Sequence, residues 1–286
     1  MTSIEKILEE NKFLLAPGVY DALSAKLARQ SGFNALFISG YSVAASSLGV
    51  PDVGLLTQTE IVEAARRVCR SVDCPVIVDA DTGYGGVVNV VRTVKELIAA
   101  GAKGCFLEDQ VWPKRCGHMK GKRVIPMEEH VQKIRAACDA RGTEDFFIVA
   151  RTDAREANSS LDDAIARAKA YKQAGADALF VEAPQSKDEL VRISRELAPP
   201  FVANMLEGGV TPLLTGDELM KMGYKIAVFP LTGLFAAARA MADVFRHLKD
   251  TGTTKDMMER LITFDDFHTI VNLSDYHAID RNFKVL

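Results

Sequence analysis

Short apolar runs alternate with amphipathic segments along most of the chain, and this alternation constrains the fold more than any other feature. The apolar runs are nearly continuous, as in strands that are covered on both faces. Eight runs are candidate strands, at residues 14–16, 35–39, 76–79, 104–108, 147–151, 178–182, 201–204 and 226–229. Helical patterns lie between them, for example at residues 59–72, 88–100, 127–141, 161–174 and 216–222. The repeated strand–helix unit predicts an α/β protein, a closed (β/α)8 TIM-type barrel.

The chain is long for a single domain, but barrels of this class reach about 250 residues as one domain. Its 286 residues contain no linker rich in Pro, Gly or Ser and no low-complexity segment. An apolar fraction of 48% is sufficient for a large core. We therefore expect one barrel domain over residues 1–286.

Composition excludes several classes of function. A net charge of −3 without a basic stripe argues against binding to nucleic acid. No apolar run approaches the roughly 20 residues that a membrane span needs. The five cysteines are odd in number and scattered, and the N-terminus does not have the pattern of a secretory signal. These features predict a cytoplasmic protein with reduced thiols.

Polar residues stand at or just after the ends of six of the predicted strands. In barrels of this kind the active site lies at the carboxyl ends of the strands, so these side chains are expected to converge. The residues are Ser39, Asp79, Asp81, Glu108, Arg151, Glu182 and Asn204.

Two carboxylates, Asp79 and Asp81, follow a buried strand at positions i and i+2. On an extended chain they lie on the same side, where they repel unless a cation or a shared proton relieves them. The simplest explanation is a hard divalent ion with oxygen ligands, Mg²⁺ or its common substitute Mn²⁺. The alternative is a turn with solvated carboxylates.

The segment from Glu108 to His118 places a thiol among cationic groups. Lys114, Arg115 and His118 flank Cys116, and neighbouring cations lower the pKa of a thiol. Cys116 is therefore a candidate proton donor or nucleophile in a loop. The alternative is a structural cysteine that behaves as a small apolar residue.

Several motifs in order resemble the isocitrate lyase and phosphoenolpyruvate mutase superfamily. The principal ones are Asp-x-Asp-x-Gly-Tyr-Gly at 79–85, Glu-Asp-Gln at 108–110 and Pro-Lys-Arg-Cys-Gly-His at 113–118. Shorter matches lie at 39–41, 49–52, 150–154, 181–183 and 203–205. The resemblance runs from about Leu14 to the C-terminus.

The resemblance, together with side-chain chemistry, implies a role for each site residue. Asp81 would contact Mg²⁺ directly, while Asp79 and Glu108 hold its waters or share the coordination. The expected catalytic residues are Cys116 as proton donor, His118, Arg151, and Glu182, which would orient His118 or another residue of the site. The expected substrate-binding residues are Ser39, Gly40, Tyr41, Asp52, Asp79, Lys114, Gly117, Arg151, Asn204, Glu207, Pro230 and Phe235. Residues 112–122 would form a lid that excludes water from the site.

The implied activity is that of a carbon–carbon lyase, which cleaves a 2-hydroxy dicarboxylic acid into a 2-oxo acid and a carboxylate through an enolate. Phe37 stands where isocitrate lyases have the tyrosine base, so Tyr41 and a metal-bound water remain the candidates for that role. Phe235 stands where methylisocitrate lyases have an arginine, and an unpaired third carboxylate is costly to bury. We therefore expect 2,3-dimethylmalate or another 2-alkylmalate as substrate in preference to 2-methylisocitrate. Pro230 replaces the serine of the family's oxaloacetate hydrolases.

Other activities stay open because one fold can host many reactions. The loop motif also resembles that of carboxyvinyl-carboxyphosphonate phosphorylmutase, a phosphonomutase. An oxaloacetate hydrolase or decarboxylase is a third candidate, and a barrel that only senses a 2-oxo acid is a fourth.

The C-terminal region, residues 231–286, carries more apolar surface than the last helix of a barrel usually needs. The alternative is ordinary packing on the barrel wall. The resemblance implies instead that the eighth helix is exchanged between subunits of a homo-oligomer, such as a dimer of dimers. His247, His268 and His277 lack the spacing of metal ligands and are expected at the surface or an interface.

Overall fold

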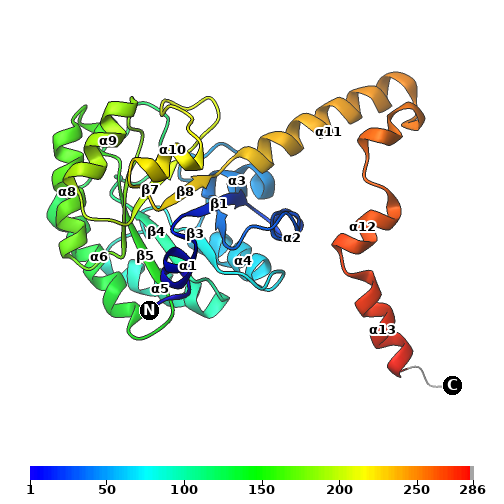
Figure 1. Ribbon diagram of the computed structural model, residues 1–286, viewed down its shortest axis with the longest axis horizontal. Helices are drawn as coiled ribbons and strands as arrows, with labels where there is room; N and C mark the ends of the chain where they lie inside the picture. The colour runs from blue at the N-terminus through cyan, green and yellow to red at the C-terminus, as the bar shows by residue number, and fades with distance from the viewer. Residues whose placement is uncertain (284–286) are drawn as a thin grey trace. The chain divides into compact units, whose positions relative to one another are not determined.

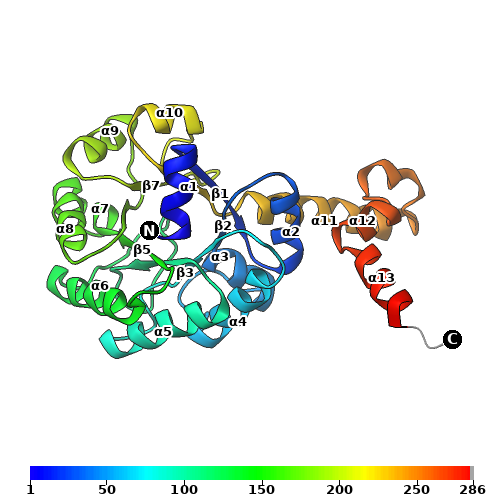
Figure 2. The same ribbon diagram turned by 60° about the horizontal axis from the view of Figure 1, so that its bottom comes forward.

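The computed structural model describes residues 1–283, and it contains a closed barrel of eight parallel strands in chain order (Figures 1 and 2). The strands are β1 (Leu14–Val19), β2 (Leu36–Ile38), β3 (Val76–Asp79), β4 (Gly104–Glu108), β5 (Phe147–Thr152), β6 (Ala178–Val181), β7 (Phe201–Asn204) and β8 (Ile226–Phe229). The barrel closes where β1 pairs with β8, with Leu14 opposite Ile226. The predicted (β/α)8 fold is confirmed.

The strands agree with the apolar runs, because strands buried on both faces consist almost entirely of apolar residues. The strands β3, β4, β7 and β8 have the predicted bounds. The strand β1 is longer than predicted, since it continues through Pro17 and Gly18. A Cβ atom at Gly18 would lie 2.1 Å from the carbonyl oxygen of Pro230, so glycine permits a close approach between the first and last strands here.

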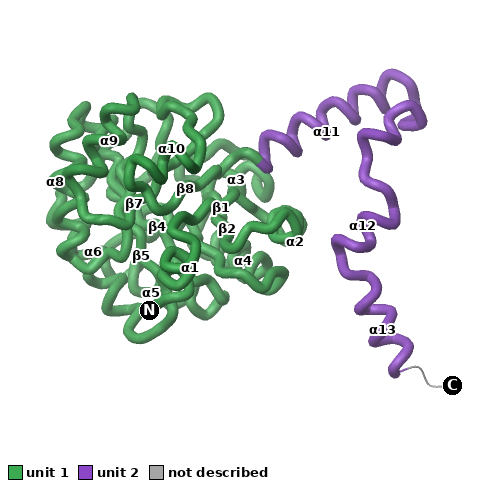
Figure 3. Tube along the Cα trace, in the orientation of Figure 1, with its two compact units in different colours: residues 1–232 green, residues 233–286 purple. Residues whose placement is uncertain are grey.

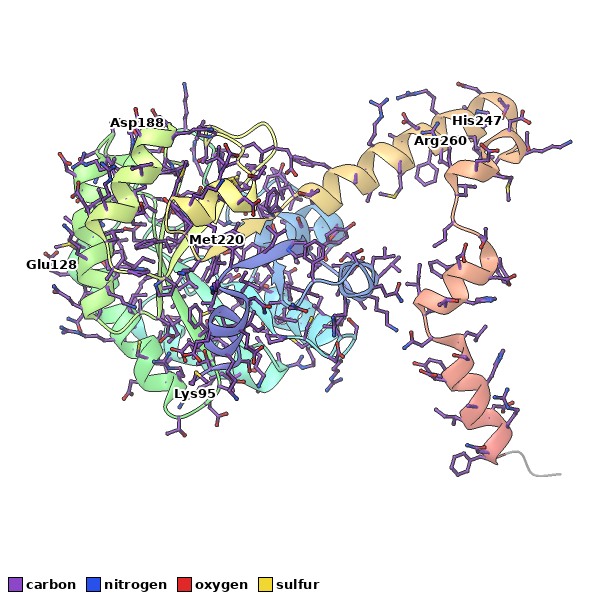
Figure 4. The ribbon with its side chains drawn as sticks, in the orientation of Figure 1. Lys95, Glu128, Asp188, Met220, His247 and Arg260 are labelled. Atoms are coloured by element: carbon purple, nitrogen blue, oxygen red, sulfur yellow. The ribbon has the colours of Figure 1, made fainter. Side chains whose placement is uncertain are left out.

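Helices follow the strands around the barrel, and most are fixed at their ends by local signals. The helix α4 begins at a capping box formed by Thr57 and Glu60, and α5 ends at Gly101, whose φ of 97° suits glycine. The helices of the barrel unit are α1 (Ser3–Asn11), α2 (Ala22–Gln30), α3 (Gly40–Val43), the π-helix η1 (Ala44–Leu48), α4 (Gln58–Cys69), α5 (Val87–Ala100), α6 (Met127–Arg141), α7 (Ala154–Ala157), α8 (Leu161–Gln173), α9 (Lys187–Glu196) and α10 (Gly216–Lys221). Charged side chains such as Lys95, Glu128 and Asp188 are exposed on the outside (Figure 4).

The inside of the barrel is filled by side chains, so the substrate site must lie at one end. Phe106 contacts Phe37 and Phe180, with ring centroids 4.7 and 5.5 Å apart. At the amino end of the strands, Ile4 of α1 is fully buried against this interior cluster. We therefore expect the substrate site at the carboxyl ends of the strands, as in other barrels of this class.

The chain divides into two compact units, Met1–Thr232 and Gly233–Leu286 (Figure 3). The second unit contains most of α11 (Thr232–Thr251), the 3-10 helix η2 (Lys255–Arg260), α12 (Phe264–Ile270) and α13 (Leu273–Phe283). Neither α11 nor α13 has a buried residue. Within the described residues, we find no helix that has both the length and the hydropathy to cross a membrane.

Candidate active site

A small cavity of about 40 Å³ lies at the carboxyl ends of the strands, where the sequence predicted the site. An apolar part of its wall is formed by Phe37, Phe180, Leu206, Val228 and Leu231, of which the sequence had placed only Phe37 at the site. The predicted site residues that line it are Ser39, Tyr41, Asp52, Asp79, Lys114, Cys116, Gly117, His118, Arg151, Glu182, Asn204 and Pro230. The cavity has room for only a few waters. A dicarboxylic acid therefore requires a side chain or the covering loop to move.

The carboxylates of Asp79, the last residue of β3, and of Asp81 both lie beside Gly40, but an extended strand is not what brings them together. The strand ends at Asp79, and Asp81 has a φ of 47°, so the expectation that both project from one extended chain is wrong. The turn brings them together instead. The amide of Gly40 donates to Asp79 Oδ2 at 3.3 Å, and a Cβ at Gly40 would lie 3.5 Å from Asp81 Oδ1.

Asp81 and Glu108 are buried carboxylates with too little positive charge near them. Burial raises the pKa of Asp81 to about 7, although Lys114 opposes the shift. Burial also raises the pKa of Glu108 well above its usual value, in spite of Arg151 at 3.4 Å. Among the described residues, Asp81 Oδ2 and Glu108 Oε1 have no hydrogen-bond partner. This set of oxygen donors fits a hard divalent cation. The same residues contain no cluster of three acidic, histidine or cysteine groups already placed to hold a metal.

Lys114 is buried and joins the covering loop to the carboxylates. Its ammonium lies 2.5 Å from Asp52 and 2.7 Å from Asp81. Burial alone would lower the pKa of Lys114, but Asp81 and Asp52 raise it by more. The pKa therefore lies well above its usual value, and the ammonium stays charged. Lys114 thus supplies one positive charge to the two carboxylates of Asp52 and Asp81.

Arg151 is the centre of a buried ion cluster. Its guanidinium binds Asp153 through two bonds of 2.9 and 3.0 Å and lies 3.1 Å from Glu182. The ring of Phe180 lies 5.2 Å from the guanidinium carbon. Burial raises the pKa of Glu182, but Arg151 and His118 together hold it well below its usual value. The guanidinium is therefore largely occupied by carboxylates of the protein itself.

His118 has neighbours that fix its tautomer. The amide of Val210 donates to Nδ1 at 3.0 Å, so that nitrogen must carry a lone pair. The proton of the neutral ring is then on Nε2, which lies 3.2 Å from Glu182. The predicted contact between Glu182 and His118 is present. Asn204 lies 3.3 Å from Nε2 and donates to the carboxylate of Glu182.

Cys116 is half-buried at the cavity, and its side chain is a protonated thiol. Burial raises its pKa to about 11, and Asp52 and Glu182 add to the shift. The expectation that this pKa is lowered is wrong, because burial outweighs the lowering effect of Lys114, and Arg115 donates to the carbonyl of Lys120 at 3.3 Å. A protonated thiol is suited to donate a proton and poorly suited to attack as a nucleophile.

Other predicted residues lie outside the cavity wall. The carboxylate of Glu207 accepts a hydrogen bond from Thr232. Phe235 belongs to the second unit and is 41% exposed, so its contact with substrate stays a prediction. The sequence missed Lys122 and Asp153, which are fully buried and 3.1 Å apart.

A (β/α)8 barrel with a thiol, an imidazole and buried carboxylates at its carboxyl end has the architecture of a barrel enzyme. The family model described as phosphoenolpyruvate phosphomutase matches residues 4–249. The chain belongs to the phosphoenolpyruvate mutase and isocitrate lyase superfamily, and it is an enzyme; its named relatives include lyases and mutases.

Three relatives match nearly the whole chain. Carboxyvinyl-carboxyphosphonate phosphorylmutase of Arabidopsis thaliana is 53% identical and covers 100% of this chain and 85% of its own length. Petal death protein of Dianthus caryophyllus is 51% identical over 99% of this chain and 89% of that protein. The 2,3-dimethylmalate lyase of Eubacterium barkeri is 44% identical over 98% and 96%.

Solved structures agree with the fold. A crystal structure of 2,3-dimethylmalate lyase superposes with a TM-score of 0.91 at 34% identity, over 99% of this chain and 95% of that one. A phosphonopyruvate hydrolase in complex with oxalate and Mg²⁺ superposes with a TM-score of 0.87 at 27% identity, over 99% of each chain.

Proposed function

We propose that this protein is a Mg²⁺-dependent carbon–carbon lyase that cleaves a 2-alkylmalate, such as 2,3-dimethylmalate, into a 2-oxo acid and a carboxylate. The protonated thiol of Cys116 at the cavity is the observation that carries this proposal. Cleavage next to the hydroxyl-bearing carbon leaves an enolate, and an enolate needs an acid in a site closed to water. A relative 44% identical is a 2,3-dimethylmalate lyase.

The step balances with one base and one acid. A base removes the proton of the substrate hydroxyl, the carbonyl of the 2-oxo acid forms, and the electrons of the breaking carbon–carbon bond enter the enolate. Cys116 Sγ gives its proton to the enolate carbon, and the thiolate recovers a proton before the next turnover. Asp79, Asp81 and Glu108 would hold Mg²⁺, which polarises the oxygens of the bound acid as a Lewis acid.

The cavity wall supports a substrate with an alkyl group. Phe37, Leu206 and Val228 offer apolar contact, whereas Lys114 and Arg151 already pair with carboxylates of the protein. A third substrate carboxylate would therefore lack a counter-ion in this wall, which is costly for a buried charge. This argues for a branched malate over 2-methylisocitrate.

A phosphonomutase is the second candidate, because the relative that is 53% identical is a carboxyvinyl-carboxyphosphonate phosphorylmutase. A mutase of that kind would use the same carboxylates and the same loop. Sequence identity alone favours it, while the thiol and the apolar wall favour the lyase.

We also propose a cytoplasmic homo-oligomer, a dimer of dimers with the eighth helix exchanged. All five cysteines are free, which suits a reducing compartment. The second unit exposes large apolar side chains, including Phe245 at 63% and Phe264 at 78%.

The test is the release of 2-oxo acid, coupled to lactate dehydrogenase, with Mg²⁺ and a substrate panel. The panel contains 2,3-dimethylmalate, other 2-alkylmalates, 2-methylisocitrate, isocitrate and oxaloacetate, and each reaction is repeated with EDTA. We expect preference for an alkylmalate and loss of turnover with EDTA. Preference for 2-methylisocitrate would show that another cation holds the third carboxylate. If no acid of this panel is turned over but a phosphonate is, the result would establish the phosphonomutase activity.

A further inference from the structure

We propose that Lys122 is a positioning residue that holds the loop of residues 111–126 over the cavity and sets the depth of Cys116 and His118. Its side chain is fully buried, whereas its loop neighbours Lys120 and Arg123 are exposed. The ammonium donates to the carbonyl oxygen of Gly117 and lies 3.1 Å from Asp153 Oδ1. A buried ammonium on a loop therefore fastens the loop to the residue next to β5.

Two contacts attach the segment from His118 to Lys122 to the buried ion cluster around Arg151. At one end, His118 contacts Glu182 at 3.2 Å, and at the other Lys122 contacts Asp153 at 3.1 Å. Arg151 lies between these two carboxylates and binds both. Residues 118–122 thus straddle a row of alternating charges.

Next to the attachment at His118 the loop lies against the cluster with no spare room. A Cβ at Gly117 would lie 2.4 Å from Arg151 Nη2 and 2.6 Å from the carboxyl carbon of Glu182. Because Lys122 binds the carbonyl of this same glycine, it fixes the backbone between Cys116 and His118. A shift of about 1 Å at reacting groups can lower turnover a hundredfold.

The charge balance of the cluster gives Lys122 a second effect that a structural residue would not have. Lys122 faces Asp153 and, at 4.0 Å, Glu156. Asp153 in turn lies near Arg151 and near the buried carboxylates of Glu182, Glu108 and Asp109. Burial raises the pKa of Asp153, but Arg151 and Lys122 hold it below its usual value. Removal of Lys122 leaves Arg151 as the cation that binds both Asp153 and Glu182.

The experiment compares Lys122→Met with Lys120→Met, a matched control that removes the same charge from an exposed position in the same loop. Three quantities are measured: the midpoint of thermal unfolding, amide hydrogen exchange of residues 114–119, and the pH profile of turnover. The exchange measurement needs no substrate. Only the kinetic measurement rests on the proposed function. A wild-type enzyme without turnover would therefore contradict that function and leave the exchange result valid.

We expect exchange of the loop amides to become roughly tenfold faster in Lys122→Met, the factor for loss of a charge-assisted hydrogen bond, and to stay unchanged in Lys120→Met. Turnover should fall roughly a hundredfold, and the acidic limb of its pH profile should move to higher pH. Lys122→Arg, which keeps the charge, should restore the position of that limb.

Two results would overturn the proposal. One is a folded Lys122→Met protein whose loop exchanges as slowly as the wild type. The other is loss of turnover with an unmoved acidic limb. If Lys122→Met does not fold, Lys122→Gln keeps a donor without the charge, and the acidic limb must still move in that variant.

Discussion

The neighbours of Cys116 keep its thiol protonated, and the neighbours of His118 fix its tautomer. Burial and two carboxylates keep Cys116 a thiol, and the amide of Val210 keeps a lone pair on His118 Nδ1. A neutral imidazole with its proton on Nε2 donates toward Glu182. The protonated thiol supports the proposal that Cys116 gives the proton.

Replacement of Cys116 by serine tests this assignment. A hydroxyl has nearly the size of a thiol and is a far weaker acid, so turnover should fall roughly a hundredfold or more while the fold is kept. Turnover and the thermal unfolding midpoint are measured side by side. Cys69→Ser is the matched control, because Cys69 is also a free, partly buried cysteine but lies on α4. Full activity of Cys116→Ser would exclude the proton-donor role.

The burial of His130 predicts how the free energy of unfolding depends on pH. It is fully buried beside Tyr171, and burial, with the cations Lys133 and Arg167, lowers its pKa to about 3. The unfolded chain then binds a proton that the folded chain does not, so the free energy of unfolding must fall as the pH drops from about 6.5 toward 3. At pH 5 the loss is about 2 kcal/mol.

His130→Phe keeps a ring and removes the titrating group, so its free energy of unfolding should change less between pH 7 and pH 5 than that of the wild type, by about 2 kcal/mol. Urea unfolding at the two pH values measures the difference. His277→Gln, at an exposed position, is the control and should leave the wild-type dependence intact. Parallel profiles for His130→Phe and the wild type would refute the assignment.

The residues that the sequence predicted and those that it missed differ in one physical respect. Asp79, Glu108 and Arg151 could be found because each ends an apolar run, and strand ends meet in a barrel. Lys122 stands in a stretch rich in Lys, Arg and Gly that resembles a solvated loop. Its burial depends on Asp153 and Gly117, and such a tertiary contact has no periodic signal in the sequence.

At the scale of elements, the spacing of apolar residues and the glycines at helix ends were sufficient to locate the strands and the long helices. The four-residue helices α3 and α7, which directly follow β2 and β5, were not predicted. Four residues are too few for a helical period to appear. These short helices matter for the site, since α3 begins at Gly40 beside Asp79, and α7 follows Asp153.

We expect turnover to depend on the loop of residues 111–126, and Gly117→Ala tests its fit. The added methyl would lie within 2.6 Å of Arg151 and Glu182, so either the loop or these two side chains must move. We expect a loss of turnover of roughly a hundredfold with little change in the thermal unfolding midpoint. Gly86→Ala is the control, because a Cβ at Gly86 meets nothing within 4 Å and its φ is −77°. Equal activity of the two variants would show that the loop tolerates the displacement.

At the scale of the whole molecule, strand closure accounts for the barrel but leaves the second unit without a core of its own. In the part of this unit that the structure describes, only Met257 and Ile270 are buried apolar residues. Many of its large apolar side chains are exposed, namely Phe235, Met241, Phe245, Leu248, Met258, Ile262, Phe264, Phe267, Tyr276, Ile279 and Phe283. Contiguous apolar surface on a helix marks an interaction site. The sequence could predict this excess of apolar residues, but not the partner that covers them.

A second copy of the chain is the partner that we predict, and Phe245 is the position to change. Burial of one phenylalanine side chain contributes about 1.5–3 kcal/mol, so Phe245→Asp should weaken association by roughly tenfold to hundredfold for each copy of the site. Sedimentation velocity should show the wild type well above the mass of one 31.2 kDa chain, and the variant shifted toward that mass. Lys249→Asp changes an exposed charged residue of the same helix α11 and should sediment like the wild type. A wild-type protein that sediments as one chain at micromolar concentration would contradict the oligomer. Its apolar side chains would then have to pack within a single chain.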